Sequence, residues 1–151
     1  LFFKHLFYYT APPFQSEPLT ENQIKRKKGY DKFVASFGKN KEVTIREGRC
    51  QKIINKDGEE DYRQKGVDAL MVSDMVSVPL KFPKIRKIIL VTSDTDFCPI
   101  IGDIEKLGVK VILYTYYEKA RKSKFSISHH LIDCCEDTFY ITKNDFEKSK
   151  K

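Results

Sequence analysis

Two aspartates separated by one residue, Asp94 and Asp96, directly follow an apolar stretch of the chain, and their types and spacing suit metal chemistry. The stretch Ile88 to Val91 is mostly β-branched and predicts a strand buried on both faces, central in a parallel sheet. Open α/β sheets bind their ligands outside the carboxyl ends of the strands. Two ionised carboxylates close together favour a cation, and oxygen ligands suit Mg²⁺ or Mn²⁺.

Two more acids lie on a predicted helix that precedes this strand. Apolar residues recur at helical spacing from Val67 to Val78, and the helix is expected to end before Pro79. Asp74 lies on the apolar stripe and Asp68 borders it, so each needs a partner or a cation if it faces a core. A structural role is also open for Asp68, because acids in a first helical turn interact favourably with the helix dipole.

The helix that follows the acidic pair offers Asp96 a structural role as well. Its apolar residues are Ile100, Ile101, Ile104 and Leu107, with Pro99 in the first turn and Gly108 as the stop. Asp96 is then in position to cap this helix. Metal binding and capping are both open for this residue.

The amino-terminal part of the chain predicts a strand, a helix and a second strand. Residues 2–10 are aromatic and β-branched and form the first strand. Thr20 and Gln23 have the form of a capping box, and the helix that they start should stop at Gly38. Residues 41–46 alternate and form a short strand, whereas residues 51–64 are either a hairpin around an Asp-Gly turn or a mobile loop.

The carboxyl-terminal part continues the alternation. Residues 109–115 predict a buried strand, residues 128–135 a short helix, and residues 139–142 a last strand, with a frayed end over residues 143–151. Alternating strands and helices specify a mostly parallel sheet with helices on both faces. In such a sheet the first turn that holds Asp68 and the strand end that holds Asp94 lie on the same side, so the two acids are expected to converge.

Composition sets the class of protein and of partner. The 151 residues are 40% hydrophobic, which is enough for one globular domain. The net charge of +7 and the pI near 9.1 favour a polyanionic partner such as nucleic acid. The basic run Lys25, Arg26, Lys27 and Lys28 is either a solvated helix face or a phosphate-contacting surface.

The expected compartment is the cytoplasm. No apolar segment approaches the roughly 20 residues of a membrane helix, and the first stretch is not a signal peptide. The four cysteines show no metal-binding spacing, which favours a reduced, intracellular protein. His129, His130, Cys134 and Cys135 resemble a zinc cluster in composition, but adjacent residues on one helix diverge. A zinc site there would need other elements, and structural or surface roles are favoured.

Four segments together resemble the NYN family of PIN-like nuclease domains. They are Lys65-Gly66-Val67-Asp68, Ser73-Asp74, Ser93-Asp94-Thr95-Asp96-Phe97 and Leu107-Gly108-Val109-Lys110-Val111. The closing stretch Leu131 to Ile141, with Asp137 before Phe139-Tyr140-Ile141, also fits the family pattern. The resemblance implies a three-layer Rossmann-like (PIN-like) α/β fold with a mostly parallel sheet.

The resemblance also implies an activity and its residues. It implies an Mg²⁺- or Mn²⁺-dependent endoribonuclease in which Asp68, Asp94 and Asp96 bind metal and carry catalysis. Ser93, Asp74 and Asp137 would be secondary site residues. RNA would be the substrate, bound in part by Lys65 and by the basic run Lys25, Arg26, Lys27 and Lys28. A homodimer is one candidate assembly.

The family begins with a strand that carries an Asp and, shortly after it, an Asn. Nothing before Leu1 supplies these residues, so the chain is expected to be a single NYN/PIN-like domain over residues 1–151 that lacks its first strand.

Two alternatives to the nuclease stay open. One is an inactive PIN-like module that binds RNA or a protein partner. The other is a haloacid-dehalogenase-type phosphatase, which also places Asp-x-Asp after an apolar strand. That motif starts its domain, whereas only 55 residues follow Asp96 here, with Phe97 and Cys98 in place of the usual Gly and Thr or Val.

Overall fold

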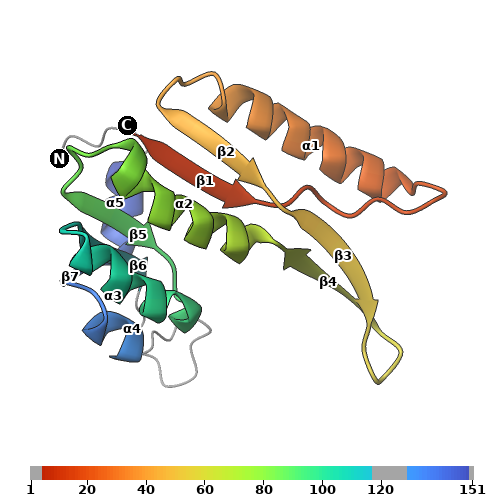
Figure 1. The fold of residues 1–151 in the computed structure, drawn as a ribbon. Coiled ribbons are helices and arrows are strands. Elements are labelled where there is room, and N and C mark those ends of the chain that lie inside the picture. The colour runs from red at the N-terminus through yellow and green to blue at the C-terminus, as the bar shows by residue number, and fades with distance from the viewer. Residues whose placement is uncertain (1–4, 117–128, 150–151) are drawn as a thin grey trace. The chain divides into compact units, whose positions relative to one another are not determined.

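The computed structural model describes residues 5–116 and 129–149, which form helices and strands of a mixed α/β protein (Figure 1). The chain divides into two compact units, Leu1–Ser73 and Asp74–Lys151. Within the described residues, no helix is both long enough and apolar enough to cross a membrane.

The first unit opens with a strand, a helix and a parallel strand. Strand β1 (Leu6–Thr10) pairs in parallel with β2 (Val43–Glu47), and helix α1 (Glu21–Phe37) connects them. The predicted capping box is present, because Thr20 Oγ1 accepts from Gln23 N at 3.3 Å and Gln23 Oε1 accepts from Thr20 N at 3.1 Å. The local sequence therefore determines where α1 begins.

Aromatic contacts hold α1 against β1. The ring of Tyr8 lies edge-on to the rings of Phe33 and Phe37, with 5.4 Å between ring centroids in each pair. Phe33 and Phe37 stack on each other one helical turn apart. The helical spacing of these aromatic residues thus packs the helix on the strand.

Strands β3 (Arg49–Ile54) and β4 (Glu60–Lys65) form an antiparallel hairpin, so of the two alternatives for this region the structure has the hairpin. Asn55 N donates to the carbonyl of Glu59 at 2.9 Å, and Gly58 occupies the left-handed region with φ +79°. The side chain of Asn55 also accepts from the backbone N–H of Asp57 and Glu59. The glycine and the asparagine therefore fix the turn.

Helix α2 (Val67–Lys81) continues through Pro79, so the prediction that it ends before this proline is wrong. Proline removes only one intrahelical hydrogen bond, the one to the carbonyl of Met75. The last turn still closes, since Phe82 N donates to the carbonyl of Val78 at 2.9 Å. Met75 and Val78 are buried, and their burial favours the continued helix.

The second unit is built on a parallel sheet of order β5-β6-β7, formed by β5 (Lys87–Val91), β6 (Lys110–Tyr116) and β7 (Asp137–Ile141). In the described part of the chain β6 lies between the other two strands, so the prediction that Ile88 to Val91 is the central strand is wrong. It is also not buried on both faces: Leu90 is 3% exposed, but Val91 is 65% exposed.

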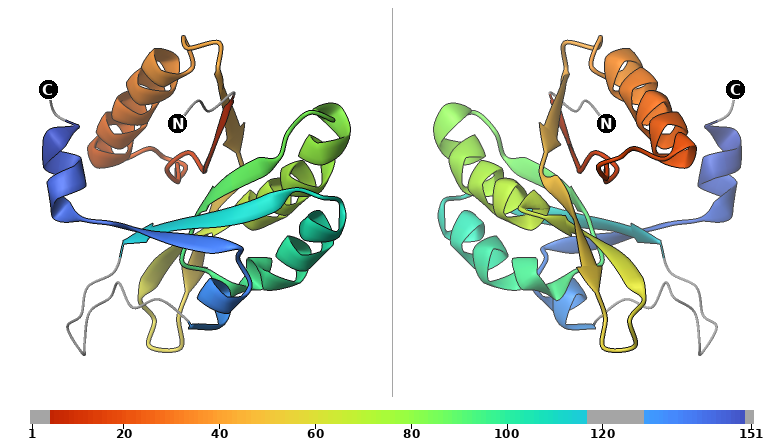
Figure 2. Two further views of the ribbon diagram at one scale, coloured as in Figure 1. Left: turned by 90° about the vertical axis from the view of Figure 1, so that its left-hand side faces the viewer. Right: turned by 90° about the vertical axis from the view of Figure 1, so that its right-hand side faces the viewer.

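Helices cover one face of this sheet. The 3₁₀ helix η1 (Thr95–Phe97) and α3 (Cys98–Lys106) connect β5 to β6, and α4 (His129–Asp133) precedes β7. Consecutive parallel strands joined by right-handed crossovers place their connections on the same face, and Figure 2 shows α3 and α4 on one side of the sheet. The core residues of this unit are mostly from these elements: Leu90, Phe97, Cys98, Ile101, Ile104, Val109, Val111, Ile112, Leu113 and Leu131.

The expected parallel sheets are present but small, with two strands in β1-β2 and three in β5-β6-β7 among the described residues. A three-layer Rossmann-like arrangement is not confirmed. Helix α5 (Lys143–Lys148) forms where a frayed end is predicted, because Asp145 Oδ2 accepts from the N–H and hydroxyl of Thr142 and caps it. The single domain lacking a first strand stays a prediction.

Candidate active site

The turn after β5 holds the two central acids of the predicted site. Asp94 Oδ1 accepts from Asp96 N at 2.9 Å, and Asp94 N donates to Thr92 Oγ1 at 3.2 Å. Asp94 is therefore the N-cap of η1, and the prediction that Asp96 caps the helix is wrong. The reason is that a 3₁₀ turn intervenes before α3, whose own N-cap is Phe97.

The carboxylates of this turn are exposed to solvent, whereas the residue that ends the turn is buried in the core. Ser93, Asp94 and Asp96 are exposed, whereas Phe97 is 2% exposed in the core beneath them. The hydrogen bond from Asp96 N uses one lone pair of Asp94, which leaves carboxylate oxygen for a cation. The turn thus presents hard oxygen donors from a fixed backbone, which is the donor set that Mg²⁺ or Mn²⁺ requires.

Asp68 is exposed in the first turn of α2, in the first unit. Gly66, with φ +79°, turns the chain from Lys65 at the end of β4 into this helix. Leu70 N donates to the carbonyl of Gly66 at 3.0 Å and closes the first turn. Asp94 and Asp96 belong to the second unit, so the convergence of the three acids stays a prediction.

The structure distinguishes the two secondary acids. Asp74 is 5% exposed on α2 beside buried Met75, as its place on the apolar stripe predicts. Asp137 is exposed and is the first residue of β7, level with Ile112 of β6. Through Ile112 it is level with Ile89 in the middle of β5, two residues before that strand ends. The role of Asp137 in the site stays a prediction.

The basic run lies on α1 and is mostly solvated. Lys25, Arg26 and Lys28 are exposed. Lys27 pairs with Asp31 one turn later, and its Nζ lies 5.9 Å from the ring centroid of Tyr30. The run therefore offers three exposed cations to a polyanion, and Lys65 of the same unit is exposed as well.

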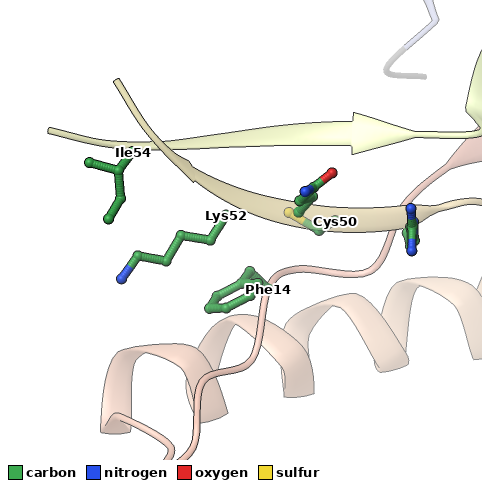
Figure 3. Close-up of a pocket in the computed structure, with 6 residues that line it drawn as sticks. Phe14, Cys50, Lys52 and Ile54 are labelled. Carbon is green, nitrogen blue, oxygen red and sulfur yellow. The ribbon is translucent and has the colours of Figure 1, made fainter. Parts of the chain in front are cut away.

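A pocket of about 380 Å³ in the first unit lies between strand β3 and the loop that carries Phe14 (Figure 3). Its lining residues are Phe14, Arg49, Cys50, Gln51, Lys52 and Ile54. The lining holds no carboxylate, and Lys52 is ion-paired with Glu60 of β4. The pocket therefore has no donor set for Mg²⁺ or Mn²⁺.

Sequence analysis weighed His130 and Cys134 as zinc ligands, but it missed Cys98, which completes a group in the second unit. One ligand atom each from Cys98, His130 and Cys134 lies within 4.8 Å of the other two. Burial, together with a hydrogen bond to Cys134, raises the pKa of the Cys98 thiol to about 12, and burial raises the pKa of Cys135 to about 11. The alternation of strands and helices in the sequence could have indicated this group, because two successive right-handed crossovers place α3 and α4 on the same face of the sheet.

Comparison with known proteins decides the family. The family model described as the NYN domain matches residues 8–142. The chain belongs to the NYN domain family. This is a PIN-like nuclease family whose members are generally ribonucleases, act on RNA and typically depend on divalent metal ions. No curated protein matches the chain.

The chain is also similar in fold to a solved structure. It is the crystal structure of a protein of unknown function from Vibrio parahaemolyticus, which is 21% identical in sequence and superposes with a TM-score of 0.52. The match covers 89% of this chain and 67% of the other. At this level of identity the likeness concerns the fold alone.

Proposed function

We propose that this NYN domain is an Mg²⁺- or Mn²⁺-dependent endoribonuclease that uses Asp68, Asp94 and Asp96. The observation that carries the proposal is the turn after β5, where Asp94 and Asp96 are exposed above buried Phe97. A family whose members are generally ribonucleases supplies the reaction class. When bound, two divalent ions would polarise a water for in-line attack on the phosphodiester and stabilise the leaving oxygen.

The side chains of the chain hold and orient the reactants in this proposal. Asp94 and Asp96 supply oxygen donors from one turn, and Asp68 supplies another from the start of α2. Ser93, exposed next to Asp94, can donate a hydrogen bond that orients a carboxylate or a water. Asp74 is buried and is therefore better placed to orient a neighbouring side chain than to touch RNA.

The basic side chains account for RNA binding. Lys25, Arg26 and Lys28 are exposed on α1, and Lys65 is exposed three residues before Asp68. Cations that neutralise phosphates give binding that weakens with salt and does not depend on base sequence.

All four cysteines are free thiols, which fits the reducing cytoplasm. A homodimer stays a prediction.

Cleavage of single-stranded RNA with Mn²⁺ present tests the proposal. The full chain should cleave RNA, and Asp94→Asn should slow cleavage by about 100-fold or more, because an amide oxygen is a weaker metal ligand than a carboxylate. Asp103→Asn is the matched control, since Asp103 is also an exposed acid of the second unit and forms an ion pair with Lys106. It should cleave at the wild-type rate.

Three results would contradict the proposal. Equal cleavage by wild-type protein and Asp94→Asn would remove Asp94 from the site. RNA binding without cleavage would favour the inactive binding module instead. Hydrolysis of a generic phosphomonoester with Mg²⁺ would favour a phosphatase, because the proposed nuclease site should leave that substrate unchanged.

A further inference from the structure

The second unit brings together two thiols and an imidazole from separate elements. Cys98 is the first residue of α3, and His130 belongs to α4. Cys134 follows α4 one turn after His130, and its backbone N–H donates to the carbonyl of His130 at 3.2 Å. Residues four apart on a helical turn share a face. Cys98 then supplies the third donor, so that all three ligand atoms lie within 4.8 Å of one another.

The cluster is buried from solvent at Cys98 and open to solvent at His130. Cys98 is 8% exposed, and the residues next to Cys98 and His130 in the sequence, Phe97 and Leu131, are buried. Cys134 is half-buried and His130 is exposed. The thiol of Cys98 lies 3.8 Å from the carbonyl oxygen of His130, so α3 and α4 already meet at this point.

We propose that Cys98, His130 and Cys134 bind a zinc ion, with two thiolates and one imidazole as ligands and water in the fourth position. Zinc takes sulfur ligands at about 2.3 Å and nitrogen ligands at about 2.0–2.1 Å, so neighbouring ligand atoms around a tetrahedral ion lie roughly 3.5–3.8 Å apart. The present arrangement needs to contract by only about 1 Å to match. Exposed His130 leaves the fourth position open to solvent.

The donor set distinguishes this site from the proposed carboxylate site. Thiolate and imidazole ligands select zinc and other borderline or soft ions, whereas Mg²⁺ and Mn²⁺ prefer oxygen. Binding releases one proton from each thiol, and the resulting negative charges are neutralised by the metal. Two protons therefore leave for each zinc ion bound.

The zinc ion would fix the turn that carries the acidic pair. Helix α4 contacts η1, which lies between Asp94 and Cys98 in the sequence. A metal bridge from Cys98 to His130 and Cys134 ties the start of α3 to α4. The bridge would thereby restrict the motion of the backbone from Asp94 to Cys98. The zinc proposal does not depend on whether the acids cleave RNA.

The test is zinc binding by reduced, metal-free protein in competition with a chromophoric chelator. The wild-type chain should bind one equivalent, and Co²⁺ in its place should give a thiolate-to-metal charge-transfer band. Zinc should also raise the midpoint of thermal unfolding, because it binds only the folded site. A wild-type chain that binds no zinc would overturn the proposal.

Neighbouring residues of the same types provide matched controls. His130→Asn and Cys134→Ser should each weaken zinc binding by at least about 100-fold, whereas His129→Asn and Cys135→Ser should bind as the wild type does. Equal affinity in Cys134→Ser and Cys135→Ser would overturn the proposal. Cys98→Ser alters a buried position, so the folding of this variant is checked by circular dichroism. If Cys98→Ser unfolds, the variants at His130 and Cys134 decide the test. A Cys98–Cys134 disulfide that forms in air even when zinc is bound would also contradict the site.

Discussion

Asp94 combines a structural and a chemical role at the level of single residues. Its side chain caps the turn of η1 by accepting from Asp96 N, and the same carboxylate is exposed to solvent. A cap fixes the rotamer of the side chain, and a fixed carboxylate binds a cation at a lower entropic cost. Capping and metal binding are therefore compatible uses of this aspartate.

Gly48 is a second residue whose type is dictated by its surroundings. Its N–H donates to the carbonyl of Thr10 at 2.9 Å, between β2 and β3. A Cβ at this position would lie 2.5 Å from the carbonyl oxygen of Lys65 and 2.8 Å from Cγ2 of Val67. Only glycine lets these two backbone segments approach, so it helps to place the chain that leads into Asp68.

Gly48→Ala should therefore destabilise the protein by about 1–3 kcal/mol, because the added methyl group meets backbone that cannot move aside. Urea unfolding followed by circular dichroism measures the change. Gly29→Ala is the control: an added Cβ at Gly29, inside α1, meets nothing within 4 Å. It should stabilise the helix by roughly 0.5–1 kcal/mol. Equal stability of Gly48→Ala and the wild type would contradict the close approach.

Helix α1 is attached to its two strands by few contacts at the level of elements. It contains no fully buried residue. Tyr8 of β1 contacts its aromatic rings, and the hydroxyl of Tyr30 donates to the carboxylate of Glu47 at the end of β2. Burial of Tyr30 and its hydrogen bond to Glu47 raise the pKa of the phenol well above its usual range.

Tyr30→Phe should reduce the free energy of unfolding by about 1 kcal/mol, since it removes a hydrogen bond to a charged, partly exposed group. The double variant with Glu47→Gln shows whether the two side chains interact. If they do, the double variant should lose less than the sum of the single losses. Additive losses, measured by urea unfolding, would show that the pair contributes nothing.

The pair of Tyr30 and Glu47 also makes the stability of the protein depend on pH. An acid whose pKa is raised on folding keeps its proton in the native state after the unfolded chain has lost it. Above the ordinary tyrosine pKa near 10, the unfolded state thus binds fewer protons, and stability falls as pH rises. Wild-type stability should fall more steeply than that of Tyr30→Phe above pH 10. Parallel curves in urea unfolding would contradict the assignment.

The edge of β5 is the notable feature at the level of the whole molecule. Among the described residues β5 pairs with β6 alone, and Ile89 and Val91 are 36% and 65% exposed. Apolar edge strands with unpaired backbone groups invite another strand. We therefore expect the backbone groups of β5 that point away from β6 to be unprotected.

Amide hydrogen exchange can test this open edge. The amides of β5 that point away from β6 should exchange roughly tenfold or more faster than those that donate to β6. The amides of β6 are the control, because among the described residues strands flank it on both sides and its amides should be protected. Equal protection of all the amides of β5 would contradict the open edge.

The sequence by itself determined the features that depend on neighbours along the chain. Thr20 and Gln23 predicted the start of α1, Gly108 the end of α3, and the acids after Val91 the turn with exposed carboxylates. The order of the segments from Lys65 to Ile141 indicated the NYN family, which the family match confirmed. Caps, turns and periodicity are local interactions, so a single sequence contains them.

Only the tertiary structure decided which distant elements meet. Nothing in the apolar run of β5 distinguishes a central strand from its neighbour, and the pairing made β6 central. The burial of Met75 and Val78 carried α2 past Pro79, against the local preference of proline. Cys98 lies 32 residues before His130, and only the packing of α3 and α4 on one face of the sheet brings them together. These outcomes depend on contacts that are far apart in the sequence, and local preference does not encode them.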